Sequence, residues 1–255
     1  MKEFIEQTIR EAGEILLNNF GKIKSVESKG KRDIVTEVDK KVEAFIIQKI
    51  KEKFPQHGIL GEETGDHKGK EYKWYIDPLD GTKNYTKKIP FFDISIALTY
   101  KNEITHAAIL LPTLGDLIYA EKGKGATLNG KQVKVSEISS LSDSFVTFCF
   151  GKSDEGVKKA TQIYSTLLPN VFSLRQFGAA GFELTLVGSG AVEAYYMNNF
   201  KTPWDVAAGA LIIREAGGKV TNFKGEEFRL EHTNLLASNG RIHKELLGKI
   251  NKAIE

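Results

Sequence analysis

The apolar positions of residues 1–55 recur with the period of an α-helix. Five of them, spaced three or four apart, line one face of an opening helix: Ile5, Ile9, Ala12, Leu16 and Phe20. Gly21 can end this helix in a left-handed conformation. After a polar stretch, Thr36 and Asp39 form a capping-box-like pattern. The pattern predicts a second helix from Thr36 to a stop at Pro55.

From residue 58 to residue 150 the pattern changes to that of short β-strands. Apolar and β-branched runs are separated by Gly, Pro, Asn and Asp, which favour turns. The runs predict strands at 58–60, 72–76, 94–99, 105–111, 117–119, 133–135 and 144–150. This half of the chain therefore resembles a layer of helices packed on an antiparallel sheet.

The remainder of the chain alternates between helix and strand patterns. Helices are predicted at 155–168, 180–187, 206–216 and from 242 onwards, and strands at 171–174, 191–196, 219–221 and 235–237. Such alternation is typical of an α/β layer. Because no flexible linker separates the two patterns, we expect residues 1–255 to form a single domain with two lobes, 1–140 (α+β) and 141–255 (α/β).

Composition and charge exclude several classes of protein. With 255 residues, of which 41% are hydrophobic and 27% charged, the chain can bury a core without disulfides. The net charge is only +3, which gives no support to nucleic-acid binding. No apolar run is long enough to cross a membrane, and the N-terminus does not resemble a signal peptide, so we expect a cytoplasmic protein.

The sequence also lacks the residue patterns that bind zinc and the complete motif of a phosphate-binding loop. Cys149 is the single cysteine and lies in an apolar run, where a buried thiol is expected. The five histidines are scattered and give no ligand spacing. Residues 125–131 match most of a phosphate-binding loop, but Gln132 stands where Ser or Thr must hold magnesium. Asn129-Gly130 is therefore predicted to be a hairpin turn.

Acidic residues stand at three predicted element ends. Asp77 ends an apolar strand, and Asp80 follows it just before Gly81. Taken alone, Asp-Pro-x-Asp-Gly is typical of a type I turn. Glu62 and Glu63 follow a second strand. Asp205 precedes the helix predicted at 206–216, where it can also act as its N-cap.

If these acids converge, cations must accompany them. Two carboxylates about 4 Å apart repel by about 4 kcal/mol at an effective dielectric constant near 20. Oxygen ligands from carboxylates, a carbonyl and a hydroxyl favour the hard ions Mg²⁺ or Mn²⁺ over zinc. Whether the acids converge is not decided by the sequence pattern alone.

The motifs together resemble the inositol monophosphatase family of the magnesium-dependent, lithium-sensitive phosphatase superfamily. The likeness is carried by Gly61-Glu62-Glu63, by Asp77-Pro-Leu-Asp80-Gly-Thr82-x-Asn84-Tyr85 and by Trp204-Asp205-Val-Ala-Ala-Gly209, in this order and spacing. Further matching segments, such as Asp33-Ile-Val-Thr36-x-x-Asp39, extend it over nearly the whole chain. The resemblance implies a layered αβαβα sandwich of the sugar-phosphatase type and a homodimer.

The resemblance also implies roles for individual residues. The metal ligands would be Glu62, Asp77, the carbonyl of Leu79, Asp80 and Asp205, holding two or three Mg²⁺ ions, for which Mn²⁺ can substitute. Asp39 and Thr82 would orient the attacking water, Glu62 would share in catalysis, and Glu63 would stand behind the metals. The substrate-binding residues would be Asp80, Gly81, Thr82, Arg175, Gly178, Ala179 and Asp205. Asp93 stays unassigned.

The implied reaction is hydrolysis of a small phosphate monoester by metal-activated water, with myo-inositol 1-phosphate as the favoured substrate. One departure matters: residues 195–204 lack the glutamate that inositol-specific members place before Trp-Asp. Asn198, Asn199 or Lys201 is expected to bind a polyol or second phosphate there, which keeps fructose 1,6-bisphosphate as an alternative. Less favoured are 3′-phosphoadenosine 5′-phosphate and, from another class, partnership with the transcription machinery.

The polar stretch between the first two helices is expected to form a loop over the site. It runs from Lys22 to Arg32 and can act as a mobile lid. Lys29 within it is expected to be solvated, with an approach to the metal site as the alternative.

Overall fold

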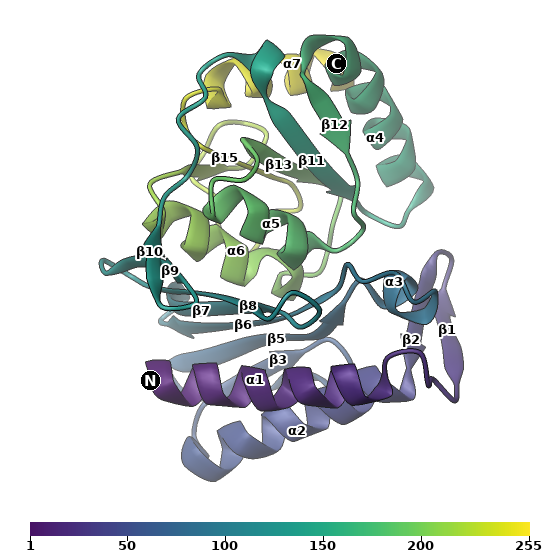
Figure 1. Ribbon diagram of the computed structural model, residues 1–255, viewed down its shortest axis with the longest axis vertical. Helices are drawn as coiled ribbons and strands as arrows, with labels where there is room; N and C mark the ends of the chain where they lie inside the picture. Colours follow the sequence, from purple (N-terminus) through teal and green to yellow (C-terminus); the bar gives the residue numbers. More distant parts are fainter.

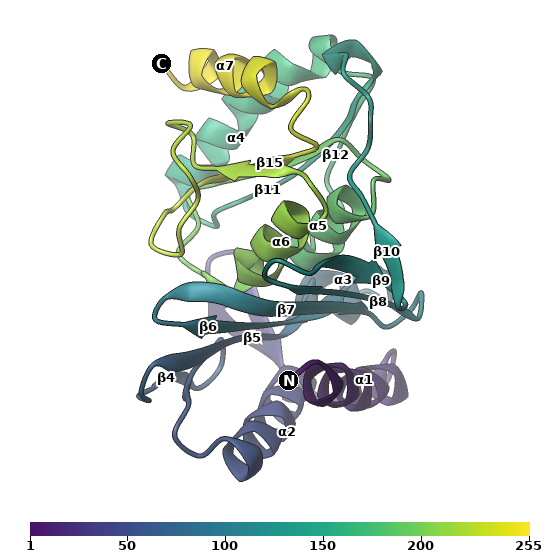
Figure 2. The same cartoon turned by 90° about the vertical axis from the view of Figure 1, so that its left-hand side faces the viewer.

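A computed structural model describes residues 1–255 as five stacked layers (Figure 1). Helices α1 (Lys2–Asn19) and α2 (Glu37–Lys53) form the first layer. They cover one face of an eight-stranded sheet, whose other face is covered by α5 (Ala180–Gly188) and α6 (Trp204–Glu215). A five-stranded sheet and then α4 (Asp154–Leu167) with α7 (His243–Ile254) complete the stack (Figure 2). The predicted αβαβα sandwich is thus confirmed.

The larger sheet is almost entirely antiparallel. Its strands, in spatial order, are β10 (Lys131–Val133), β9 (Gly125–Leu128), β8 (Asp116–Glu121), β7 (Glu103–Leu111), β6 (Asp93–Tyr100), β5 (Tyr72–Asp80), β3 (Gly58–Gly61) and β4 (Gly65–His67). Only β3 and β5 run parallel, so the predicted antiparallel sheet has one parallel pair. The reason is that β4 folds back on one edge of β3, so the chain must return to reach the other edge.

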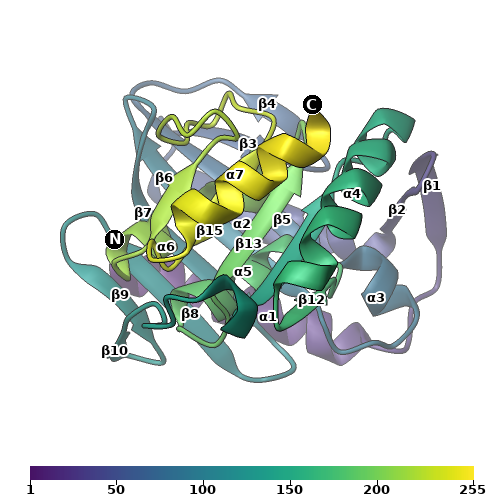
Figure 3. The same cartoon turned by 90° about the horizontal axis from the view of Figure 1, so that it is seen from above.

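The smaller sheet is mixed. Its order is β12 (Ser173–Arg175), β11 (Phe145–Phe150), β13 (Ala194–Asn198), β15 (Leu235–Ser238) and β14 (Lys219–Thr221). The first three strands are parallel, joined through helices, as the alternating pattern predicts. The last two pair antiparallel. Figure 3 shows α4 and α7 side by side over this sheet.

Three apolar cores join the five layers. Ile9 and Ile46 pack with Trp74 beneath α1 and α2. Leu184 and Ile212 lie at the centre, between the two sheets. The outer core lies under α4 and α7 and includes Val146, Ile163 and Leu246. The strongly periodic helices were predictable because burial imposes their apolar faces.

Several elements differ from the sequence predictions. The polar stretch before Thr36 forms a hairpin, β1 (Val26–Gly30) and β2 (Asp33–Thr36), in place of the predicted loop. Every residue of β1 is exposed, so no alternation marks it. Short elements were also missed, namely β4, β9 and α3 (Thr82–Thr86). The strand predicted at 133–135 begins two residues earlier, after the predicted Asn129-Gly130 turn, where both residues have positive φ.

The remaining details concern helix ends and short turns. Thr36 and Asp39 form the predicted capping box at α2. Helix α6, however, begins at Trp204 with Pro203 as its N-cap, so the prediction that Asp205 caps it is wrong. Two 3₁₀ turns lie at Leu141–Asp143 and Leu168–Asn170. None of the helices is both long and apolar enough to cross a membrane.

Candidate active site

The acidic motifs meet at one cavity of about 450 Å³ between the two sheets. Figure 1 shows the start of α5 directed towards the side of the molecule that carries α3 and the β1–β2 hairpin. Among the predicted residues, the cavity is lined by Glu62, Asp77, Leu79, Asp80, Gly81, Thr82, Gly178 and Asp205. These residues come from strand ends and helix starts that are far apart in the sequence. The fold therefore brings together most of the predicted site.

The end of β5 places two acids and a carbonyl at this cavity. The pairing of β5 with β6 shifts register between Asp77 and Asp80. Pro78, which has no N–H to donate, lies within this irregularity. Gly81 then turns the chain with φ of 84°. A Cβ there would lie 2.8 Å from the carbonyl oxygen of Phe91, so the turn requires glycine for space as well as conformation.

A buried acid that the sequence analysis did not single out, Glu43, supports Glu62 and Glu63. Its two carboxylate oxygens accept the backbone N–H groups of Glu63 and Thr64 at 2.9 and 2.7 Å. The carboxyl group lies where a Cβ on Gly61 would stand, at 2.7 Å. Glu43 sits within the apolar face of α2, and an acid on such a face was the signal that could have revealed it.

Lys29 of the hairpin approaches the same acids. Its ammonium nitrogen lies 3.0 Å from Glu62 Oε1 and 2.7 Å from Glu63 Oε1. The expectation that Lys29 is a solvated loop lysine is therefore wrong, and the alternative, an approach to the acidic site, is the observed one. Burial opposes its charge, but hydrogen bonds to Glu63 and the charge of Glu62 outweigh burial and raise the pKa of Lys29.

Three carboxylates in the cavity lack a cationic partner. Burial raises the pKa of Asp77 well above its usual range, and the nearby carboxylates, chiefly Glu62 and Asp80, raise it further. Burial likewise raises the pKa of Asp80 to about 6, against an opposing hydrogen bond from Gly181 N–H. The pKa of Asp205 is also raised by burial, then by Asp80. Accommodating all three as anions requires added positive charge.

The residues fit a hard divalent cation by donor chemistry, although the side chains do not form a closed ligand cage. No group of three or more His, Cys, Asp or Glu side chains stands at metal-ligating distances. Instead each acid has a local donor: Asp77 accepts from Leu79 N–H at 3.1 Å, and Asp205 from the Thr202 hydroxyl at 2.5 Å. The donor atoms are nevertheless all oxygens, and no cation balances the charge of Asp77, Asp80 and Asp205, which suits Mg²⁺ or Mn²⁺.

Asp39 and Thr82 form a pair behind the cavity. Asp39 Oδ2 accepts from the backbone N–H and the hydroxyl of Thr36, while Oδ1 lies 3.1 Å from Thr82 Oγ1. Asp39 therefore caps α2 and contacts Thr82 at once. Burial raises the pKa of Asp39 to about 6, although its hydrogen bonds with Thr36 and Thr82 lower it.

Two further buried acids hold the start of α5. Glu183 Oε1 accepts the N–H groups of Phe177 and Gly178 at 2.9 and 3.0 Å. Asp93 Oδ2 accepts the N–H of Phe182 at 2.7 Å, and a Cβ on Gly181 would lie 2.1 Å from Asp93 Oδ1. Asp93, which the sequence left unassigned, thus fixes a helix beside the cavity.

Two predicted substrate contacts are placed elsewhere. Arg175 is not among the cavity residues: its guanidinium lies over the Phe145 ring and its Nε donates to Ser173. It lies on β12, an edge strand of the smaller sheet. Ala179 is fully buried and reaches the site only by packing beside Gly81.

The segment before Trp204 also differs from expectation. Asn198 donates to the carbonyl of Gly156 and Asn199 to the hydroxyl of Ser153. Neither lines the cavity, and Lys201 does not either. These side chains therefore hold the neighbouring loop, while Met197 and Thr202 face the cavity.

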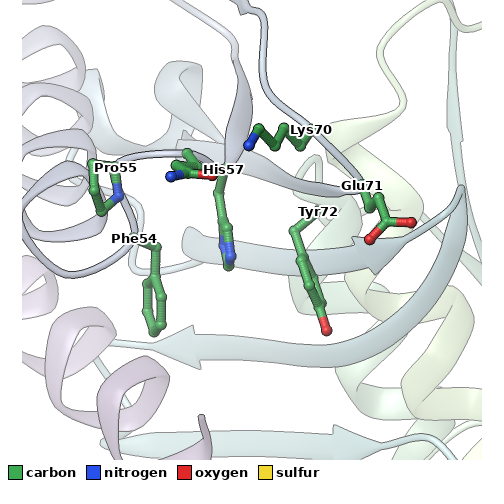
Figure 4. Close-up of a pocket in the computed structure, with 7 residues that line it drawn as sticks. Phe54, Pro55, His57, Lys70, Glu71 and Tyr72 are labelled. Atoms are coloured by element: carbon green, nitrogen blue, oxygen red, sulfur yellow. The ribbon is translucent and has the colours of Figure 1, made fainter.

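A second cavity, of about 430 Å³, lies at the far end of β5 (Figure 4). The rings of Phe54, His57 and Tyr72 stand stacked in a row beside it, with centroids 4.8 and 4.7 Å apart. This cavity contains none of the predicted site residues.

Comparisons with known proteins agree with this arrangement. The profile of the Inositol monophosphatase family matches residues 1–255. A Thermotoga maritima protein named fructose-1,6-bisphosphatase/inositol-1-monophosphatase is 35% identical over 254 residues, covering 99% of this chain and 96% of the relative. A Pseudomonas aeruginosa protein named Nus factor SuhB is 35% identical over 250 residues, covering 94% and 92%.

A solved structure also resembles this chain. The IMPase structure from Thermotoga maritima superposes with a TM-score of 0.92 at 34% identity and covers 99% of this chain and 97% of its own. Sequence and fold thus agree along the whole chain. The protein belongs to the inositol monophosphatase family, whose members are metal-dependent phosphatases that hydrolyse phosphate monoesters.

Proposed function

We propose that this phosphatase uses Mg²⁺ and that myo-inositol 1-phosphate is its preferred substrate. The observation that carries the metal assignment is a set of three carboxylates without cationic partners in one cavity, of which Asp77 is buried and Asp80 and Asp205 are half-buried. The residues that would hold the ions are Glu62, Asp77, Leu79 through its carbonyl, Asp80 and Asp205. Bound Mg²⁺ would neutralise phosphate oxygens and lower the pKa of a coordinated water.

Thr82 and Asp39 would position the attacking water. The single hydroxyl proton of Thr82 has two acceptors at 3.1 Å, Asp39 Oδ1 and the carbonyl of Leu79. When Thr82 donates to Asp39, its oxygen lone pairs remain free to accept a hydrogen bond from water. Asp39 is fixed by Thr36, so it holds the hydroxyl in this orientation. The pair would thus orient the nucleophile, while Glu62 and Glu63 stand on the same side.

The opposite wall would receive the substrate. Gly81, Gly178 and Ala180 line the cavity with little side-chain bulk, so their backbone can approach a phosphate closely. Asp80 and Asp205, besides holding metal, would accept hydrogen bonds from substrate hydroxyls. Arg175 is not part of this proposed set, because its guanidinium packs on the Phe145 ring outside the cavity.

Fructose 1,6-bisphosphate is the second candidate substrate. The name of the Thermotoga maritima relative includes both activities, and residues 197–204 contain no acid that would favour an inositol ring. A role with the transcription machinery is a further alternative, because the Pseudomonas aeruginosa relative is named a Nus factor. The even charge of the chain, 36 basic against 33 acidic residues, gives that alternative no support.

Phosphate release from a panel of substrates tests the proposal. The panel contains myo-inositol 1-phosphate, fructose 1,6-bisphosphate and 3′-phosphoadenosine 5′-phosphate, each with Mg²⁺ or with EDTA. We expect the highest kcat/KM on myo-inositol 1-phosphate and no turnover in EDTA. Higher kcat/KM on another substrate would replace the substrate assignment, and undiminished turnover in EDTA would remove the metal. Inactivity on all of them with tight binding to RNA polymerase would support the transcription alternative.

A further inference from the structure

Glu183, a fully buried acid in the first turn of α5, has two oxygens in different surroundings. Three donors converge on Oε1: the N–H groups of Phe177 and Gly178, at 2.9 and 3.0 Å, and the thiol of Cys149, at 3.5 Å. Oε2 is also buried, but it has no hydrogen-bond partner. The hydrogen bonds that hold residues 177 and 178 therefore all end on a single oxygen of Glu183.

The turn that Glu183 holds forms part of the cavity wall. Phe177 and Gly178 both line the cavity, and Gly178 has φ of 80°, a conformation that favours glycine. The carbonyl oxygen of Phe177 accepts from Asn84 Nδ2 at 2.7 Å. Phe177 is thus fixed on both sides, through its N–H by Glu183 and through its carbonyl by Asn84. The position of this wall is therefore set before a ligand binds.

The asymmetry of the two oxygens is typical of a neutral carboxylic acid. An ionised carboxylate carries charge on both oxygens, and an anionic oxygen that is buried without a donor loses its hydration without compensation. A protonated carboxyl group instead has one carbonyl oxygen that accepts and one hydroxyl that needs no donor. Glu43 shows the contrasting arrangement, because each of its oxygens accepts one backbone N–H.

The titratable groups around Glu183 are all acids. They come from three neighbouring strands: Asp93 of β6, Cys149 of β11, and Tyr195 and Tyr196 of β13. Burial raises the pKa of Glu183 to about 8, and its hydrogen bonds, chiefly those from Gly178 and Phe177, offset the effect of burial only in part. The surroundings and the hydrogen-bond geometry thus both favour the neutral acid.

We propose that Glu183 is a positioning residue that keeps its proton at neutral pH and, through its carbonyl oxygen, holds the Phe177–Gly178 turn against the substrate phosphate. The role rests on the proposed function, which places the phosphate beside Gly178. The turn then requires the acceptor oxygen of Glu183 and does not require its charge.

Two substitutions separate the acceptor oxygen from the charge. Glu183→Gln keeps a carbonyl oxygen for the same donors, so we expect its KM and kcat to stay within about twofold of those of the unaltered protein. Glu183→Leu leaves two backbone N–H groups unpaired, and we expect its KM to rise about tenfold or more. Its kcat should change little, because the wall provides binding that the ground state and the transition state share. Both are measured on the substrate with the highest kcat/KM in the panel above.

Equilibrium binding gives a readout that is independent of turnover. Calorimetric titration of the full chain with inorganic phosphate, in Ca²⁺ in place of Mg²⁺, measures the dissociation constant directly. Glu183→Gln should bind phosphate as the unaltered protein does, whereas Glu183→Leu should bind about tenfold more weakly or worse. Equal binding by the unaltered protein and Glu183→Leu would show that Glu183 does not position the wall.

Infrared spectroscopy detects the proton itself. A protonated carboxyl group has a C=O stretching band that an ionised carboxylate lacks. The difference spectrum between the unaltered protein and Glu183→Gln should contain this band at neutral pH, and the band should disappear as the pH rises past about 8. Glu245→Gln is the control: Glu245 is exposed on α7, so its difference spectrum should contain carboxylate bands only.

The outcomes distinguish the role of Glu183 from the proposed function. A difference spectrum with only carboxylate bands, or a KM in Glu183→Gln as high as in Glu183→Leu, would overturn the neutral acid. If Glu183→Leu does not fold, the infrared band and the KM of Glu183→Gln still decide. A protein that shows the band and binds phosphate as expected, but hydrolyses no substrate of the panel, would retain the role of Glu183 and refute the proposed function.

Discussion

Asp80 connects two elements through a single carboxylate, since it ends β5 and its Oδ2 accepts the N–H of Gly181 on α5 at 2.9 Å. Asp80→Asn keeps an acceptor for Gly181 but removes a charge from the proposed metal site. We expect turnover to fall by about a thousandfold or more, since a metal ion supplies several kcal/mol of charge stabilisation. Steady-state phosphate release measures this. Full turnover in Asp80→Asn would exclude Asp80 as a metal ligand.

The same variant should not weaken the fold. In metal-free protein, burial and then the charge of Glu62 raise the pKa of Asp80, so removing its charge reduces the cost of burial and the repulsion. The thermal midpoint of metal-free Asp80→Asn should equal or exceed that of the unaltered protein. A midpoint several degrees lower would mean that the lost activity reports unfolding.

His243 makes the stability depend on pH at a site far from the cavity. The Thr221 hydroxyl donates to the carbonyl oxygen of Asn222, so its oxygen accepts from Nε2–H of His243 at 2.9 Å. The other ring nitrogen, Nδ1, then accepts from the Ser238 hydroxyl at 2.8 Å. This network holds the neutral imidazole. Burial lowers the pKa of His243 to about 4 from 6.5, and the charge of Lys219 adds to the effect.

The direction of the pH dependence follows from this lowered pKa. Between pH 6.5 and about 4 the unfolded chain binds a proton at His243 that the folded chain does not. The stabilisation is complete above pH 6.5 and is lost as the pH falls to about 4, by about 2–3 kcal/mol. Urea unfolding at several pH values should show this slope, and His243→Gln should reduce it. An identical slope in His243→Gln would assign the dependence to other groups.

At the scale of elements, Glu43 connects helix α2 to the segment that carries Glu62. The Glu43 carboxylate accepts hydrogen bonds from the backbone N–H groups of Glu63 and Thr64. The side-chain amide in Glu43→Gln has only one acceptor oxygen, so its NH₂ group faces the second backbone N–H. The Glu62 segment should therefore shift. Because groups that orient metal ligands typically affect metal affinity by about 10–100-fold, we expect the Mg²⁺ concentration for half-maximal activity to rise by this factor.

A matched substitution on the same helix isolates the effect. Glu52 is exposed and far from the Glu62 segment, so Glu52→Gln removes an equal charge without touching its backbone. Its Mg²⁺ requirement should match that of the unaltered protein. If Glu43→Gln lowers the thermal midpoint without changing the Mg²⁺ requirement, Glu43 serves the fold alone.

The elements also show why some predictions succeeded and others failed. Helices α1 and α2 were predictable because each buries a continuous apolar face, and the burial imposes a period that the sequence displays. The β1–β2 hairpin is exposed along the whole of β1, so nothing in its sequence records a buried side. The cap assigned to Asp205 failed because Pro203 begins the helix earlier.

At the scale of the whole molecule, the proposed metal ligands come from both halves of the chain. Glu62 and Asp77 belong to residues 1–140, whereas Asp205 belongs to residues 141–255. We propose that these halves behave as two lobes and that bound Mg²⁺ clamps them together. Free Mg²⁺ at about 100 times its dissociation constant should stabilise the protein by about 2.7 kcal/mol.

Thermal unfolding tests the clamp. For a chain of this size, such stabilisation should raise the midpoint by about 5–10 °C. The shift should be much smaller in Asp205→Asn, which leaves the ligands of the first half in place. NaCl at equal ionic strength is the control for screening. An equal Mg²⁺ shift in Asp205→Asn would show that the second half contributes no ligand.

The sequence by itself determined the helices with apolar faces, the layered architecture through family resemblance, and the acids at element ends, because these are recorded in local spacing. Only the tertiary structure decided which charges meet. It placed Arg175 on the Phe145 ring, introduced Glu43 and Glu183 as supports, and brought Arg32, Lys83 and Lys152 to the same cavity. Those residues are separated along the chain, and their convergence depends on how whole layers pack, which no local pattern records.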